Sequence, residues 1–146
     1  MNNKQEQLTD LAIIKQLEQE IGKKLDQISL DKITSDFDNG YAVDENKNVV
    51  GLNLDESELY TIPNALINLK NLQKLSLYSN KIDELPAAFG QLQKLSYLGL
   101  ENNQLKKLPI SFVQLQNLGR LDLSRNQLKE LPTWYTPPNC CQVYIG

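Results

Sequence analysis

Residues 72–80 read LQKLSLYSN, and this stretch returns twice at the same interval along the chain. Residues 95–103 read LSYLGLENN and residues 118–126 read LGRLDLSRN, so each copy begins 23 residues after the one before. A looser copy, VVGLNLDES, occupies 49–57, and a truncated one, CQVYIG, begins at Cys141. Self-similarity at a period of about 20–50 residues is typical of repeat architectures. The sequence therefore predicts repeats at 49–71, 72–94, 95–117 and 118–140, followed by a partial repeat at 141–146.

Each repeat alternates apolar and polar residues from position 3 to position 7, which predicts a short strand with one buried face. Strands of successive repeats would pair about 4.8 Å apart as a parallel sheet. Proline stands at position 15, where its fixed φ suits the first turn of a short helical segment. Position 18 is large and apolar or aromatic, and predicts a stacked spine under these segments: Leu66, Phe89, Phe112 and Tyr135. We therefore expect an α/β solenoid with a curved parallel sheet on its concave side and short helical or 3-10 segments on its convex side.

Asparagine stands at position 9 of three repeats, where the chain must turn away from the strand: Asn80, Asn103 and Asn126. A buried polar side chain is costly unless it is hydrogen-bonded. An amide has donors and an acceptor for backbone groups of its own turn and of the adjacent repeat. We expect these residues to form a structural ladder that holds the bend rather than a ligand site.

Residues 1–48 are predicted to form an N-terminal helical cap and hairpin lead-in to the repeat domain at 49–146. After a polar, frayed start at 1–7, Thr9 or Asp10 can cap a helix with one aliphatic stripe, and Gly22 can end it. A second short helical or irregular segment should follow, with its apolar residues packed on the first helix: Leu25, Ile28, Leu30 and Ile33. Such a face could bind a partner helix or a membrane surface, but a cap over the end of the repeats is the favoured explanation.

The stretch DFDNG at 36–40 lacks the ligand spacing of a calcium-binding EF-hand. With Gly40 in the sixth place, Ser35 and Phe37 would fall on ligand positions, and only Asn39 suits one. Asn39 and Gly40 instead predict a turn, since both tolerate positive φ. Beyond it, the apolar residues at 41–43 and 49–52 flank a polar segment and predict a β-hairpin.

The side-chain inventory argues against catalysis and metal binding. The chain has no histidine, which removes the commonest general base and the commonest metal ligand. Cys140 and Cys141 are adjacent, so neither zinc-finger spacing nor a loop-closing disulfide is available. Two reduced thiols are favoured over a strained vicinal disulfide. We expect no enzyme activity, no cofactor and no metal.

The charge distribution argues against nucleic acid and membrane partners. The net charge is −3, with −4 in the first 48 residues and +1 in the remainder. Neither part forms the basic face that binds nucleic acid or the polybasic patch that binds anionic lipid. No apolar run approaches the ~18 residues of a membrane span, and the N-terminus lacks the apolar segment of a signal peptide. We expect a cytoplasmic protein, and leave open its secretion as an effector.

The repeated form LxxLxLxxNxLxxLPxx[LF]xxLxx resembles the 23-residue class of leucine-rich repeats, found in bacterial proteins and in intracellular Ras-binding scaffolds. The resemblance covers 49–140 and a partial strand to 146. It implies a curved solenoid whose concave sheet recognises another protein without catalysis. The alternative is that the chain is the recognition portion of a larger bacterial effector or signalling protein. Two repeats depart from the pattern: Ser57 replaces the ladder asparagine in the first, and Pro138 replaces a core leucine in the fourth.

Partner choice should depend on the side chains that face outward from the concave sheet, at positions 3, 5 and 7 with position 8 at the edge. Tyrosine and arginine are common at binding hot spots. Tyr78 and Tyr97 fall in adjacent repeats, flanked by Glu101 and Arg120. The expected surface for a protein or peptide partner is Lys74, Ser76, Tyr78, Tyr97, Glu101, Asn102, Arg120, Asp122 and Arg125. An ordinary solvated sheet face with cross-strand packing explains the same residues equally well.

Residues 141–145 predict an uncharged edge strand. The 23-residue register would expose Val143 and Ile145 and turn Cys141 inward. Uncovered edges of this kind recruit strands from other chains. Val143, Tyr144 and Ile145 are therefore predicted to mediate homodimerisation or binding of a partner.

Overall fold

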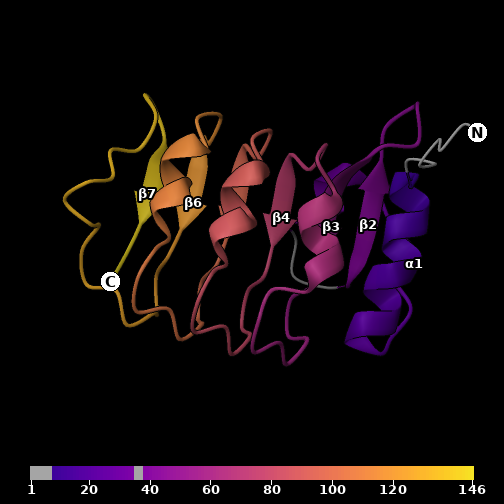
Figure 1. The fold of residues 1–146 in the computed structure, drawn as a ribbon, viewed down its shortest axis with the longest axis horizontal. Helices are drawn as coiled ribbons and strands as arrows, with labels where there is room; N and C mark the ends of the chain where they lie inside the picture. Colours follow the sequence, from indigo (N-terminus) through magenta and orange to yellow (C-terminus); the bar gives the residue numbers. More distant parts are fainter. Residues whose placement is uncertain (1–7, 35–37) are drawn as a thin grey trace, which may run out of the picture.

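A computed structural model describes residues 8–34 and 38–146. Its seven strands form one sheet in chain order, drawn from one end of the molecule to the other in Figure 1. Strands β2 and β3 pair antiparallel as the predicted hairpin, and every other neighbouring pair is parallel. The strands are β1 (Asp26–Gln27), β2 (Gly40–Val43), β3 (Val49–Asn53), β4 (Lys74–Ser76), β5 (Tyr97–Gly99), β6 (Arg120–Asp122) and β7 (Gln142–Tyr144). The frayed start predicted at 1–7 and residues 35–37 of the predicted turn region lie outside the described residues.

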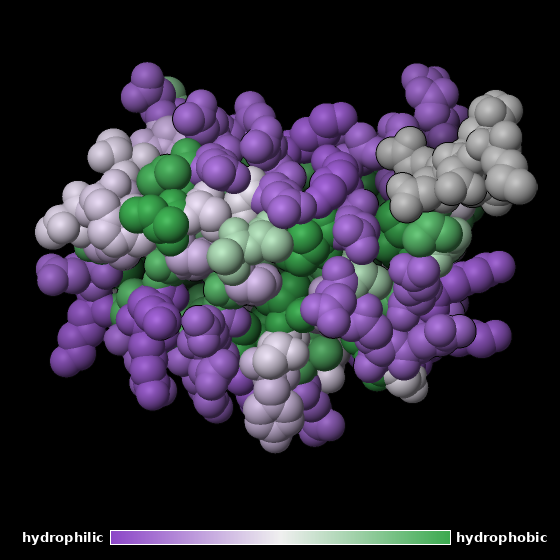
Figure 2. Space-filling view, viewed as in Figure 1, coloured by the Kyte–Doolittle hydropathy of each residue, from purple (hydrophilic) through white to green (hydrophobic). Residues whose placement is uncertain are grey.

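Three 3-10 helices cover the convex side: η2 (Asn64–Asn68), η3 (Ala87–Gln91) and η4 (Ile110–Gln114). Each begins directly after the repeat proline, which occupies the N-cap rather than the predicted first turn. The fourth repeat has a single turn here, in which the Tyr135 N–H donates to the Pro132 carbonyl at 3.0 Å. Figure 2, in the same view, shows a band of hydrophobic residues across the middle of the molecule between hydrophilic rims.

The predicted spine is continuous under the convex side. Leu66 is fully buried. The rings of Phe89 and Phe112 stack with centroids 6.3 Å apart, and Tyr135 meets Phe112 edge-on at 5.3 Å. Aromatic pairs in these geometries add to the stabilisation from burial. The α/β solenoid predicted from the 23-residue period is confirmed.

The predicted N-terminal helix is α1 (Asp10–Ile21). The Thr9 hydroxyl accepts from the Ala12 N–H at 3.1 Å, and Gly22 ends the helix with φ of 74°. The Glu20 carboxylate then accepts from the backbone N–H groups of Asn64 and Ala65, at 2.8 and 2.7 Å. These two bonds attach α1 to the first turn of η2, so the helix covers the end of the first repeat.

The segment after α1 confirms the predicted short helical stretch but differs from the prediction in where it packs. It contains β1, which was not predicted, and the 3-10 turn η1 (Leu30–Lys32). Leu25 joins the hydrophobic core that contains the α1 residues, as predicted, but the segment then crosses the concave side of β3, where Ile33 is fully buried. A Cβ on Gly51 would lie 2.6 Å from Cγ1 of Ile33, and the buried Asn53 amide donates to the Ile33 carbonyl at 2.7 Å. The free part of the concave face therefore begins at β4.

The register predicted for the last strand is wrong by one residue. Strand β7 aligns Gln142 with Arg120 and Tyr144 with Asp122, so the last repeat has 22 residues instead of 23. A shift of one residue exchanges the two faces of a strand. Val143 and Ile145, predicted to be exposed, are half-buried against the core, and Tyr144 is 43% exposed on the concave side. Self-association through this strand stays a prediction.

The two cysteines are free thiols. Cys140, which takes the register of the core residue Leu118, is exposed with φ of 63°, and Cys141 is half-buried against the core. Burial raises the pKa of the Cys141 thiol. Within the described part of the chain, no three acidic or cysteine side chains gather as a metal site. No helix in that part is long and apolar enough to cross a membrane.

Candidate functional site

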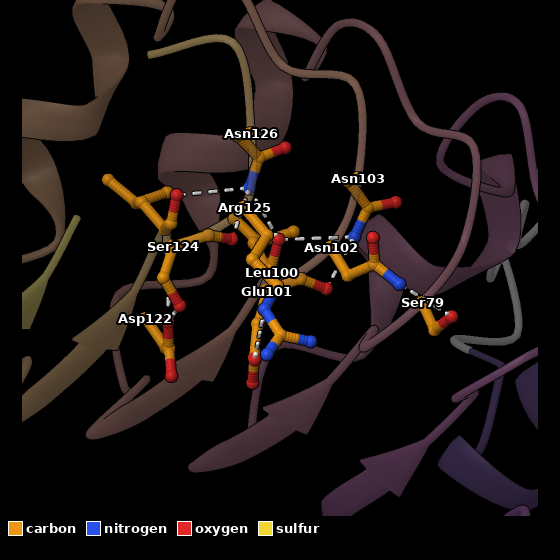
Figure 3. Close-up of polar contacts among 10 residues, drawn as sticks. Ser79, Leu100, Glu101, Asn102, Asn103, Asp122, Ser124, Arg125 and Asn126 are labelled. Carbon is orange, nitrogen blue, oxygen red and sulfur yellow. Dashed lines mark hydrogen bonds and ion pairs between the residues drawn. The ribbon is translucent and has the colours of Figure 1, made fainter. Parts of the chain in front are cut away.

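The asparagines at position 9 hydrogen-bond each repeat to the one before it (Figure 3). Asn103 donates to the carbonyls of Leu77 and Leu100, at 2.9 and 3.1 Å, and accepts from the Ile82 N–H at 3.0 Å. Asn80 and Asn126 make the equivalent bonds in their own repeats. These bonds fix the backbone directly beyond the concave strands.

Ser57 takes this place in the first repeat, and the lead-in supplies the missing amide. Asn39 donates to the Asp55 carbonyl at 2.8 Å, and the Lys23 ammonium donates to the Ser57 hydroxyl at 2.8 Å. Burial lowers the pKa of Lys23. The N-terminal segment thus supplies hydrogen bonds that an asparagine supplies in the later repeats.

A hollow of about 340 Å³ lies on the concave face. Six residues predicted for this face line it: Ser76, Tyr78, Tyr97, Glu101, Asp122 and Arg125. Lys74, Asn102 and Arg120 lie outside it, although Lys74 pairs with Tyr97 in the sheet and Asn102 donates to the Ser79 hydroxyl at 3.0 Å. Thr34, Asp55 and Gly99 complete the lining. Asp55 and Gly99 take predicted outward-facing positions but were not among the residues expected to bind a partner, and Thr34 was not predicted on this face. Asp55 could have been predicted from the repeat pattern, because it stands at position 7 of its repeat, as Tyr78 and Glu101 do in theirs.

Asp55 organises one end of this hollow. One of its oxygens accepts from the Ser76 hydroxyl at 2.6 Å and from the Tyr78 N–H at 2.8 Å. Its other oxygen accepts from the Asn53 amide at 3.1 Å. Ser76 is only 3% exposed, so its hydroxyl serves this network instead of reaching a partner.

The opposite end is held by pairs within and between repeats, several of which Figure 3 shows. The Arg125 guanidinium lies 3.7 Å from the Glu101 carboxylate. Asp122 accepts from the Ser124 N–H at 3.0 Å and from its hydroxyl at 2.5 Å. The hollow therefore presents the carboxylates of Glu101 and Asp122, each of which has one polar partner within the chain.

Tyr97 connects the hollow to its neighbouring strands. Its ring lies against Gly99, where an added Cβ would be 3.0 Å from the hydroxyl oxygen. The Arg120 guanidinium carbon lies 5.9 Å from the Tyr97 ring centroid and 4.9 Å from that of Tyr144. Burial raises the pKa of Tyr97, and the Arg120 charge opposes that rise. Tyr144 thus lies on the concave face, whereas the 23-residue register places it at an inward-facing position.

A larger hollow of about 650 Å³ lies on the convex side between η2 and η3. Its floor is formed by Ile62 and Ile67. Gly90, at the position of Ile67 in the next repeat, lies so close to η4 that a Cβ would be 2.4 Å from the Ser111 carbonyl. The side chain of Ile67 prevents the same approach of η2 and η3. Packing alone therefore accounts for this hollow.

The leucine-rich repeat family model matches residues 47–105 and 79–128. The two matches together span 47–128, which is more than half of the chain. The chain belongs to the leucine-rich repeat family. Domains of this family commonly mediate protein–protein interactions. No match was found among curated proteins.

The chain is similar to several solved structures. A leucine-rich repeat protein of Leptospira interrogans, LIC12759, is 47% identical over 48% of this chain, with a TM-score of 0.46. A plant ice-binding protein is 24% identical over 81% of the chain (TM-score 0.52), and the ectodomain of the Arabidopsis thaliana receptor kinase SOBIR1 is 18% identical over 80% (TM-score 0.50). The chain spans 18% of the Leptospira protein, 48% of the ice-binding protein and 79% of the SOBIR1 ectodomain.

Proposed function

We propose that this chain is a non-catalytic interaction module that binds a protein or peptide on its concave sheet. The observation that carries the proposal is the hollow between β3 and β6, to which four successive repeats contribute side chains. The asparagine bonds hold those repeats in register. A site built on rigid elements loses little conformational entropy when a partner binds.

The chemistry of this face suits a polar partner segment. Tyr78 and Tyr97 supply large contact areas with hydroxyl groups. The carboxylates of Glu101 and Asp122 accept hydrogen bonds from N–H groups of a partner. Because Ile33 covers β3, the free sheet spans only β4 to β7, about 14 Å at 4.8 Å per strand. This width suits a short peptide segment better than a standard interface of about 800 Å² per partner.

The proposal can be tested by comparing proteins captured from a lysate by the wild type and by Tyr78→Ala/Tyr97→Ala/Arg120→Ala. Peptides from a captured protein are then titrated against both by calorimetry. We expect the triple variant to bind at least about tenfold more weakly, since hot-spot side chains each contribute more than about 1 kcal/mol.

Lys106→Ala/Lys129→Ala is the matched control, because both lysines are exposed at position 12, outside the concave strands. Thermal unfolding must show that all three proteins are folded. Equal affinity of the wild type and the triple variant for the same peptide would overturn the proposal.

A further inference from the structure

We infer that Arg120 recognises a carboxylate group of the bound protein or peptide. This inference rests on the proposed binding role of the concave face and assigns the chemistry of one contact. Four observations support it: the placement of the Arg120 guanidinium, the ion pairs of the concave face, the charge balance of that face, and the position of Arg120 beside the hollow.

The guanidinium of Arg120 is held in place by aromatic rings. Strand β6 lies between β5 and β7, and Arg120 interacts with Tyr97 from one neighbour and Tyr144 from the other. A guanidinium that stacks on rings keeps its N–H groups in its own plane, where they can form two parallel bonds to a carboxylate. The exposed side chain thus has two aromatic contacts within the chain, each of which modestly stabilises this placement.

Arg120 takes part in no ion pair with another described residue. Ion pairs join Lys107 to Glu84 and Arg125 to Glu101. Asp122, the acidic residue on the same strand, instead accepts from Ser124. Arg120 and Lys74 are therefore the cations of this face that lie outside those pairs, and of these two Arg120 is the one that lies against aromatic rings.

The charge balance favours a monoanion. Three anionic side chains and one cationic side chain line the hollow (Asp55, Glu101, Asp122 and Arg125), and two further cations, Lys74 and Arg120, lie on strands β4 and β6. A carboxylate can neutralise Arg120, whereas the roughly double charge of a phosphate would also face three carboxylates. Tyr97 lines the hollow and contacts Arg120, so the bound carboxylate would lie beside the partner side chain that enters the hollow.

The test is a set of N-acetylated pentapeptides titrated into the protein and followed by NMR. Ala-Ala-Glu-Ala-Ala amide carries a side-chain carboxylate, Ala-Ala-Gln-Ala-Ala amide carries none, and the free acid of the glutamine peptide carries a terminal carboxylate. A phosphoserine peptide amide completes the set. The readout is the Nε–H signal of Arg120 together with the ring signals of Tyr97 and Tyr144.

We expect the glutamate peptide to bind about threefold to tenfold more tightly than its glutamine counterpart, because charge-assisted hydrogen bonds at a partly exposed site have this effect. A similar gain for the free acid would assign a terminal carboxylate as a second source. Arg120→Gln should abolish the preference, and Arg120→Lys should lose most of it, since lysine lacks the planar fork. Lys74→Gln removes an equal charge from the same face and should retain the preference.

Equal binding of the glutamate and glutamine peptides would overturn the inference, as would tighter binding of the phosphoserine peptide. A preference that survives in Arg120→Gln would do the same. If the glutamine peptide shifts the Tyr97 signals without any preference for glutamate, the concave face still binds peptides and only the role of Arg120 fails. If none of the peptides shifts a concave signal, the inference fails without deciding whether larger partners bind there.

Discussion

Two adjacent residues in each repeat give the turn beyond the strand its shape. Position 9 is the asparagine that bonds two repeats together. Position 8 has a left-handed backbone in every repeat, with φ between 50° and 58°, and is occupied by Glu56, Ser79, Asn102 and Arg125. Only Asn102 is a residue type that tolerates this conformation well. The side chain at position 8 is thus free to vary although the backbone is strained, and Arg125 uses this freedom to pair with Glu101.

Tyr135 carries a polar hydroxyl group at a buried position of the aromatic spine. Its ring completes the aromatic spine, but its buried hydroxyl has no hydrogen-bond partner among the described residues. An unsatisfied buried hydroxyl destabilises the folded state. Tyr135→Phe should therefore raise the free energy of unfolding by up to about 1 kcal/mol. Urea denaturation measures this, with Tyr144→Phe as a control at an exposed ring.

The same substitution should change the response to alkaline pH. Burial, with a smaller contribution from Cys141, raises the pKa of Tyr135 to about 12, above the value of about 10 in an unfolded chain. Between pH 10 and pH 12 the unfolded chain releases the Tyr135 proton while the folded chain keeps it, and this stabilises the unfolded state. The free energy of unfolding is therefore unaffected by the ionisation of this group below pH 10 and falls as the pH rises to 12. The wild type should lose more stability than Tyr135→Phe over this range. Parallel curves of stability against pH for the two proteins would contradict this account.

At the scale of elements, the sequence predicted the strands and helices that recur in each repeat and missed those outside the repeat pattern. Strands β4 to β6 and the 3-10 helices follow from a 23-residue period that holds across three repeats. The period could not reveal that the stretch 134–140, WYTPPNC, makes the last repeat one residue shorter. The 23-residue register therefore predicts the wrong residues of β7 on each face of the sheet. Strand β1 is two residues long and polar, which leaves no alternation to detect. Thr34 reaches the hollow only because its segment crosses β3, a contact between unrelated segments of the chain.

That crossing depends on Gly51. A methyl group there would lie 2.6 Å from Cγ1 of Ile33 and 2.9 Å from Cδ1 of Leu30, so Gly51→Ala must shift these side chains away from β3. We expect it to lower the free energy of unfolding by about 1–3 kcal/mol, the usual cost of overpacking. Gly119→Ala is the matched control, because its Cβ would have only an ordinary contact with the Ser96 carbonyl at 3.6 Å. Guanidinium denaturation compares the two, and equal effects would argue against close packing at Gly51.

At the scale of the whole molecule, the fold is a line of units that each contact their neighbours. At one end, α1 and the hairpin cover the first repeat and bond to it. At the other, the apolar residues of β7 are only half-buried. In solenoids, stability is close to a sum of repeat and interface contributions, so weakly covered repeats open first. The aromatic and charged contacts of Arg120 and Tyr144 lie in this less protected part.

Hydrogen exchange can measure this gradient on one matched bond. The position 6 leucines Leu77, Leu100 and Leu123 are all fully buried, and each donates its N–H to the next strand at 2.7–2.8 Å. Bond length and side chain are thus the same, and only the place in the line differs. We expect Leu123 to exchange at least about tenfold faster than Leu77, with Leu100 between them, because local opening of the last repeat needs less free energy than global unfolding. Rates equal within about twofold would instead show that the repeats open together as one cooperative unit.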